Sequence, residues 1–258
     1  MGLFNIFKKD KNTNLNKQQD INSIHEVSSD INLNYETITS NIVFTDNDKL
    51  RIDKNCQIME SLGLPYLKEM KLIPLDSNTN IIGKEDIVKM MVFDLLVGRK
   101  ALNKMNNIGD VDDEVFTLNA FKYGMKDMYE IFSTISKGEF DNNKLNELAY
   151  LSERASVYAY VLGLKNKPNE INISNWNELV LLLSNYNNFD DLISKCNLIN
   201  NDEIMEYADL ITRYEWAMVE LKRLNKTSNN INHDCVLEHK KAMDFVTSFN
   251  QNIYLEKR

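Results

Sequence analysis

The chain has 258 residues, of which 43% are hydrophobic and 26% are charged, and its formal net charge is −8. These values fit a globular protein of one or two domains, and they exclude a collagen, a coiled-coil rod and a fully disordered chain. The acid excess argues against non-specific binding to nucleic acid, because phosphates require clustered Lys and Arg. The longest apolar run, Met90 to Gly98, contains Asp94 and is shorter than the ~18 residues that cross a bilayer, so we expect no stable membrane insertion.

Residues 1–45 are predicted to form a disordered or loosely docked tail. Residues 8–20 are polar and rich in Asn and Lys, a composition that buries too little surface to order itself. The first seven residues include four apolar side chains, followed by Lys8 and Lys9. They fit either a short peptide for a membrane surface or a partner, or incidental apolar residues in a disordered start. Residues 31–35 alternate apolar side chains with Asn, which indicates one short strand or an extended segment.

Residues 46–258 have a helical pattern throughout and are predicted to form one domain. The chain has only 8 glycines and 3 prolines, which suits long helices with few connections better than a β-sandwich. Breakers such as Gly63 and Gly138, and the N-cap candidate Asp141, mark several helix ends. The expected helices, in chain order, are 48–62, 83–105, 111–136, 142–164, 175–183, 189–196, 202–224 and 234–249.

Two of these segments, 145–164 and 204–224, are apolar on nearly all sides, which is typical of helices at the centre of a domain. In the first segment, small residues spaced three or four apart allow another helix to approach closely; they are Ser152, Ala155, Ala159 and Gly163. The predicted fold is therefore a single all-α, multi-helix globular domain built around two central helices.

The cysteine pattern indicates a reducing compartment. Cys56, Cys196 and Cys235 are odd in number and widely spaced, so they form neither a disulfide framework nor a CxxC pair. The apolar residues at the start are followed by lysines rather than by a long apolar segment, unlike a secretory signal. We therefore expect a cytoplasmic protein.

Several segments resemble a known protein family. Three lie in the second half: ERASVYAYVLGL (Glu153 to Leu164), DEIMEYADLITRYEWAMVE (Asp202 to Glu220) and VLEHKKAMDFV (Val236 to Val246). The segment CQIMESLGLPYLKEMKLIP (Cys56 to Pro74) is similar to the family's opening pattern. On these residues the chain resembles the bacterial family catalogued as domain of unknown function 4272. The third segment departs from that family, which tends to have Arg near His239 and Lys240 and Trp near Phe245. The resemblance implies a helical cytoplasmic protein, and it implies no activity.

Charged residues that interrupt the central helices are the main candidates for a site. Asp209 and Arg213 are four residues apart and can pair on one helix face. If the helices pack together, three acids could meet two arginines and a histidine. Two interpretations stay open: a salt-bridge network that fixes helix register, or a polar pocket for an anionic or amide-bearing ligand. The candidate ligand-binding residues are Glu153, Arg154, Tyr158, Asp209, Arg213, Trp216, Glu238 and His239, with Tyr214 as a further wall of the pocket.

Metal and nucleophilic chemistry have little support in the sequence. Residues 233–239 include two histidines, one cysteine and two acids, and Cys235 and His239 could face one way on a helix. The spacing is not HExxH, however, and Asp234 is more simply an N-cap. GxSxG, GxGxxG and P-loop motifs do not occur in the sequence, so we expect no metal, no cofactor and no catalytic residue.

The leading functional hypothesis is a non-enzymatic helical binding or accessory module, for example an immunity-type protein that blocks another protein through an acidic surface. It rests on acidity, helix content and the lack of catalytic motifs. The alternative is an enzyme or small-ligand binder that uses a polar pocket between the central helices. The expected partner is a protein or a small ligand, and not a nucleic acid.

Overall fold

The computed structural model describes residues 44–68, 70, 74–77, 79–108, 125–168, 173–174, 176–227 and 231–249. The chain divides into two compact units, Met1–Phe44 and Thr45–Arg258, and nearly all of the described residues belong to the second. Residues 1–43 of the expected tail, which include its apolar start and its short strand, lie outside the described residues, whereas Thr45 belongs to the start of the first described helix. The first part of the helix expected at 111–136 also lies outside the described residues.

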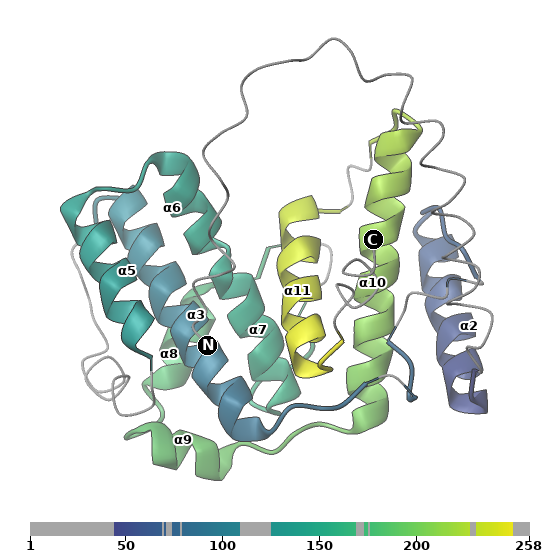
Figure 1. Ribbon diagram of the computed structural model, residues 1–258, viewed down its shortest axis with the longest axis horizontal. Coiled ribbons are helices and arrows are strands. Elements are labelled where there is room, and N and C mark those ends of the chain that lie inside the picture. Colours follow the sequence, from purple (N-terminus) through teal and green to yellow (C-terminus); the bar gives the residue numbers. More distant parts are fainter. Residues whose placement is uncertain are drawn as a thin grey trace, which may run out of the picture. The chain divides into compact units, whose positions relative to one another are not determined.

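Every regular element in the described part of the chain is an α-helix, which confirms the all-α prediction (Figure 1). The helices are α2 (Asp46–Ser61), α3 (Lys84–Met105), α5 (Lys126–Lys137), α6 (Asn142–Ala149), α7 (Leu151–Val161), α8 (Trp176–Leu183), α9 (Phe189–Lys195), α10 (Asn201–Arg223) and α11 (His233–Val246). None of these helices is long and apolar enough to span a bilayer. Most of their bounds lie within two residues of the expected ones.

Local chemistry explains where α2 begins and where α5 ends. Thr45 caps α2 in a capping box: its hydroxyl accepts the backbone N–H of Asp48, and the Asp48 carboxylate accepts the backbone N–H of Thr45. Gly138 closes α5 in the left-handed region at φ 71°, which is easily adopted only by a residue without a Cβ.

Of the two predicted N-caps, one is right and one is wrong. Asp141 caps α6 as expected, and its carboxylate accepts the backbone N–H of Lys144 at 2.7 Å. Asp234 does not cap α11. The cap is Asn232, whose side-chain oxygen accepts the backbone N–H groups of Asp234 and Cys235, so the helix begins one residue earlier than expected.

The single helix expected over 142–164 is wrong, because this segment forms two helices that meet at Tyr150. Tyr150 has ψ −11°, and the N–H of Glu153 bonds to its carbonyl three residues back, which is the tighter pattern of a 3₁₀ turn. Neither Gly nor Pro marks this junction. The break therefore has no local signal and arises in tertiary packing.

Close packing against α3 occurs at this same junction. A Cβ atom added at Gly98 would lie 2.5 Å from the Ser152 hydroxyl oxygen and 3.2 Å from the carbonyl oxygen of Ala149. Only glycine lets the two backbones come this near. The close helix approach that the small residues of the segment predicted is therefore present, and Gly98 is its counterpart on α3.

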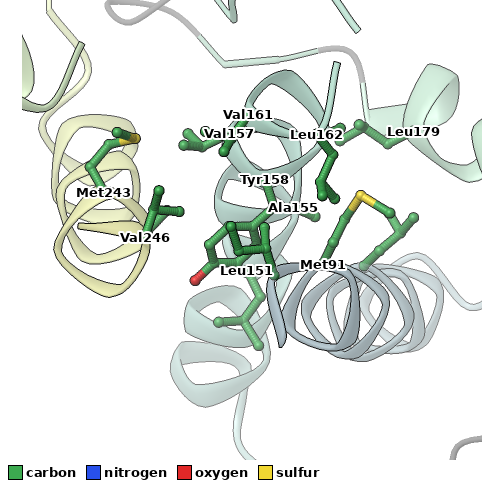
Figure 2. Close-up of a cluster of buried hydrophobic side chains, with 14 of the residues drawn as sticks. Met91, Leu151, Ala155, Val157, Tyr158, Val161, Leu162, Leu179, Met243 and Val246 are labelled. Carbon is green, nitrogen blue, oxygen red and sulfur yellow. The ribbon is translucent and has the colours of Figure 1, made fainter. Parts of the chain in front are cut away.

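The helices pack in a row of neighbours. α7 lies between α3 and α11, α10 lies between α11 and α2, and α3 also carries α5 and α6 (Figure 1). Figure 2 shows Met91 of α3 and Val246 of α11 on opposite sides of the buried Tyr158 of α7. The two helices expected to be central, now α7 and α10, have largely buried side chains, and α3 and α11 share this central position.

Candidate functional site

A buried carboxylate and a histidine join α7 to α11. Both the Glu153 and His239 side chains are 0% exposed, and His239 Nε2 lies 3.0 Å from a Glu153 oxygen. The carboxylate also accepts the Trp176 indole N–H at 2.6 Å, and the backbone N–H and hydroxyl of Ser174 at 2.8 and 2.9 Å. On the other side of the ring, His239 Nδ1 lies 2.9 Å from the Tyr207 hydroxyl of α10. We refer to these five residues as the Glu153 cluster.

Hydrogen bonds outweigh burial at Glu153. Burial alone would raise its pKa, but the bonds from His239, Trp176 and Ser174 favour the ionised form and hold the pKa below its ordinary value. The carboxylate is therefore a stable anion that organises its donors. Tyr207, His239 and Glu153 follow the order hydroxyl, imidazole and acid that activates a nucleophile. The Tyr207 side chain is only 1% exposed, however, so a substrate could not touch the hydroxyl in this arrangement.

A second group, the Arg154 cluster, lies at adjacent positions of the same two helices. It consists of Asp94 of α3, Arg154 of α7, and Glu238 and Lys241 of α11. The Glu238 carboxylate accepts hydrogen bonds from Arg154 Nε and Lys241 Nζ. Asp94 Oδ2 faces Arg154 Nη1 across 3.9 Å, too far for a hydrogen bond, and it has no other partner among the described residues. Burial raises the pKa of Asp94 to about 7 against the opposing effect of Arg154.

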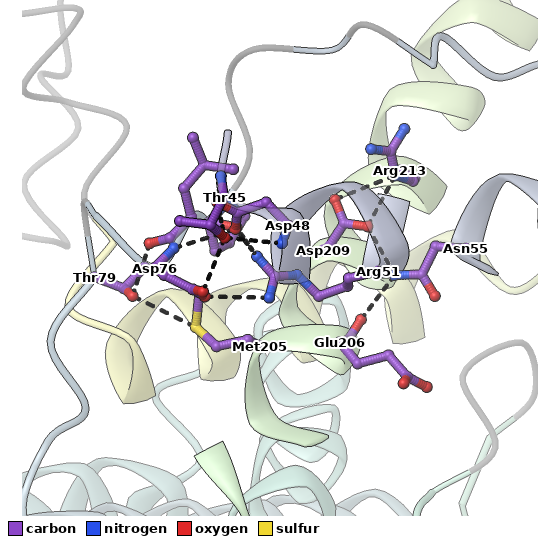
Figure 3. Close-up of polar contacts among 12 residues, drawn as sticks. Thr45, Asp48, Arg51, Asn55, Asp76, Thr79, Met205, Glu206, Asp209 and Arg213 are labelled. Carbon is purple, nitrogen blue, oxygen red and sulfur yellow. Dashed lines mark hydrogen bonds and ion pairs between the residues drawn. The ribbon is translucent and has the colours of Figure 1, made fainter. Parts of the chain in front are cut away.

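A third group joins α10 to α2 and is shown in Figure 3. Arg213 donates from Nε to Asp209 at 3.0 Å (Figure 3). Its Nη1 donates to the Leu67 carbonyl at 2.9 Å. Asn55 of α2 donates to Asp209 at 2.7 Å and to the backbone carbonyl of Glu206 at 3.0 Å. The predicted pairing of Asp209 with Arg213 is confirmed, and both side chains are almost completely buried.

The charged residues expected to meet in one place thus lie in separate groups on either side of α10. Tyr207 points to α11, where it contacts His239, whereas Asp209 points to α2, where it contacts Asn55. Two residues along a helix correspond to a rotation of about 200°, so these side chains lie on opposite faces. For this reason the Asp209–Arg213 pair does not join Glu153 and His239.

The three aromatic residues expected as walls take different positions. Tyr158 is buried in the core, where its ring meets that of Phe245 edge-on at 5.9 Å, and burial raises its pKa well above the ordinary value. Tyr214 is also buried, whereas Trp216 is half-buried. Tyr158 lies close enough to Arg154 and Asp94 to interact with their charges, so it belongs beside the Arg154 cluster.

Besides Lys241, which follows Glu238 by three residues on α11, sequence reasoning missed five residues of these groups: Asn55, Asp94, Ser174, Trp176 and Tyr207. Asp94 had a usable signal, because it is the only acid in the apolar run of α3. Asn55 had none in a chain this rich in asparagine. The other three could be found only from the packing, since nothing in their local sequence shows that they reach the Glu153–His239 pair.

Residues 233–239, which the sequence offered as a possible metal site, are arranged differently in the structure. Both ring nitrogens of His239 are engaged within the Glu153 cluster, His233 is exposed, and burial raises the pKa of the Cys235 thiol to about 12. Cys56 and Cys196 are likewise buried thiols whose pKa is raised by burial. Within the described ranges, no group of three or more His, Cys, Asp or Glu side chains is placed to hold a metal ion.

The fold and these groups define a class: an all-α domain whose central helices are cross-linked by buried acids and bases. The chain belongs to the family described as Domain of unknown function (DUF4272), whose model matches residues 51–254. This confirms the resemblance noted from the segments of the second half. Comparison with curated proteins and with solved structures gives no match.

Proposed function

We propose that the protein is a non-enzymatic helical module that binds a protein partner in the cytoplasm, in an accessory or immunity-type role. The observation that carries this proposal is the mutual pairing of the interior charges. Glu153 is hydrogen-bonded to His239, and Asp209 forms an ion pair with Arg213, and all four side chains are at most 1% exposed. Glu153 and His239 join α7 to α11, and Asp209 and Arg213 bond further to Asn55 and to the Leu67 carbonyl, so these groups are used inside the fold and recognition is left to the outer surface.

Energetics support a structural role for these pairs. Removing a charge from water costs several kcal/mol, and this cost is offset only when good geometry satisfies the remaining donors and acceptors. Glu153 meets that condition with four hydrogen bonds from three residues. A group that must bind substrate would instead keep part of its hydrogen-bonding capacity free.

Charge indicates the chemistry of the partner. With 38 acidic and 30 basic side chains, the chain repels acidic surfaces and attracts basic ones. We therefore propose a partner with a basic face. Binding of that kind is screened by salt, because the Debye length falls from about 10 Å at 0.1 M to about 3 Å at 1 M ionic strength.

Native mass spectrometry of the full chain, purified from the cells that make it, tests this proposal. We expect a complex with one other polypeptide at fixed stoichiometry, which re-forms from the two separately purified components. Its affinity should fall at least about tenfold between ~0.1 M and ~0.5 M salt. If the chain instead carries a small molecule and no polypeptide, or if the re-formed complex is insensitive to salt, the proposal is wrong.

The second candidate is a binder of a small polar ligand, and unpaired buried atoms favour it. Asp94 Oδ2, Asn55 Oδ1 and Arg213 Nη2 are buried without a hydrogen-bond partner among the described residues. Arg213→Ala separates the two candidates. A ligand binder would lose a small molecule seen in the native mass spectrum of the wild type. A protein-binding module would become less stable and keep its complex as long as it stays folded.

A further inference from the structure

Asp94 is an acid in an otherwise apolar part of α3. The side chain is 1% exposed, and it lies one helical turn before Gly98, where α3 and the α6–α7 junction approach closely. Its Oδ2 atom makes no hydrogen bond within the described part of the chain. A buried carboxylate oxygen without a partner is costly when ionised, and far less so when the group is neutral.

The cation next to Asp94, Arg154, is hydrogen-bonded to another carboxylate. Arg154 Nη1 faces Asp94 Oδ2 at 3.9 Å, but Arg154 donates its Nε hydrogen to Glu238. Glu238 also accepts a hydrogen bond from Lys241, so it bonds to both cations, whereas Asp94 Oδ2 has only the longer 3.9 Å approach of Arg154. The groups that face Asp94 are therefore Arg154 and Tyr158 from α7, and Glu238 and Lys241 from α11.

The geometry gives Arg154 two alternative acceptors. Its side chain is 21% exposed, its Nε is paired with Glu238, and its Nη1 lies 3.9 Å from Asp94, so both carboxylates lie close to one guanidinium. Which partner it takes depends on the charge of Asp94. A neutral Asp94 leaves Arg154 with Glu238, whereas an ionised Asp94 competes for it.

We propose that Asp94 is a proton-operated lock on the contact of α3 with α7. The neutral carboxyl keeps α3 packed against α7, and the ionised carboxylate draws Arg154 away from Glu238. The contact joins two parts of the helix row, since α3 carries α5 and α6, whereas α7 leads through α11 to α10 and α2. Binding or releasing one proton at Asp94 therefore changes the stability of the packing between these two parts.

Electrostatics place the transition near neutral pH and determine its sign. Burial raises the pKa of Asp94 from 3.8 to about 7, opposed by Arg154 and assisted by Glu238. A folded-state pKa above the unfolded value means that the folded chain binds the proton more tightly. The lock is therefore fully engaged below pH 3.8, and it weakens as pH rises until Asp94 is ionised in the folded state, above about pH 7.

Carbon-13 NMR of the full chain, labelled at Asp side-chain carboxyls, tests the lock. Asp94→Asn identifies the Asp94 resonance by its loss, and Asp86→Asn is the matched control at an exposed, ion-paired position on the same helix. We expect the Asp94 midpoint near pH 7 in the wild type, and an unchanged Asp94 midpoint in Asp86→Asn. The Asp244 resonance, with a pKa raised to about 6 by burial, must persist in Asp94→Asn. An Asp94 midpoint below about pH 5 would refute the proposal.

Two further measurements test the exchange of Arg154 and do not depend on the Asp94→Asn variant alone. Glu238→Gln weakens the hold on Arg154 and removes a neighbouring negative charge, so we expect the Asp94 midpoint to fall by about one pH unit. The unfolding equilibrium constant of the wild type should rise up to ~10-fold per pH unit between about pH 5 and 7, relative to that of Asp94→Asn. An unchanged midpoint in Glu238→Gln, or parallel pH profiles of wild type and Asp94→Asn, would each overturn the lock.

Discussion

Replacing Glu153 by Ala removes the acceptor on which the Glu153 cluster depends. The change strands His239 Nε2, the Trp176 indole N–H, and the backbone N–H and hydroxyl of Ser174 in the interior. Leaving a buried donor unsatisfied costs about 1–3 kcal/mol, and breaking a buried ion pair by removing one partner costs about 3–5 kcal/mol. Because the donors share one environment, the separate costs do not add in full. We expect Glu153→Ala to lower the free energy of unfolding by about 4 kcal/mol, or roughly 10 °C in melting temperature.

Urea unfolding followed by tryptophan fluorescence measures this loss directly. The chain has two tryptophans, and one of them, Trp176, donates to Glu153, so the probe reports on the cluster itself. Glu147→Ala is the control, since Glu147 is an exposed residue of neighbouring α6 paired with Lys144, and its removal should leave stability close to that of the wild type. A loss below about 1 kcal/mol in Glu153→Ala would refute the view that this carboxylate organises its donors.

The same residue predicts a pH dependence of opposite sign to that of the lock at Asp94. The hydrogen bonds hold the pKa of Glu153 below its ordinary value of 4.5, so its contribution is fully present above that pH. It is lost as pH falls through the folded-state pKa. Glu153→Gln, which keeps the shape but not the charge, should lose this acid-side slope, and unfolding measured between about pH 3 and 6 checks the difference.

Three other substitutions have defined outcomes. Gly98→Ala should cost about 2 kcal/mol in urea unfolding, because its Cβ meets backbone atoms of the α6–α7 junction, while Gly83→Ala, with open space around the position, should cost much less. Arg213→Ala should cost about 3–5 kcal/mol by leaving the buried Asp209 without its cation. Replacing both Arg213 and Asp209, by Met and Leu, should recover much of that loss in thermal melts. Thr45→Ala should cost about 1 kcal/mol through loss of the capping box, with the largest increase in amide exchange in the first turn of α2.

The helices were predictable because their ends have local causes. The end of α5 needs a residue without a Cβ at Gly138, and the start of α6 needs a short side-chain acceptor at Asp141. Both requirements can be recognised from the residue type in the sequence. The junction at Tyr150 could not be recognised, since its geometry accompanies the close approach of α3 at Gly98. A contact between positions more than fifty residues apart leaves no trace in either segment alone.

In the candidate site, too, local pairings could be predicted from the sequence and pairings between helices could not. Asp209 and Arg213 are four residues apart, so their pairing follows from helix geometry. The pairing of Glu153 with His239 depends on which helices pack together and on which positions along them face each other, and the residue types do not determine this. The expectation of one shared cluster failed because Asp209 lies on the face of α10 that turns away from α11.

α2 is attached to its neighbour α10 through a seam that mixes apolar and polar groups. Ile52, Cys56 and Met59 are buried on the same helix as Asn55, which donates to Glu206 and Asp209 of α10 and whose polar atoms regain water when the helix detaches. Such a seam resists local opening less than an apolar one, because rehydration of the polar atoms returns part of the free energy. We therefore expect α2 to behave as a separate foldon, fraying and exchanging its amides in an opening that leaves the packing of α7 against α3 and α11 intact.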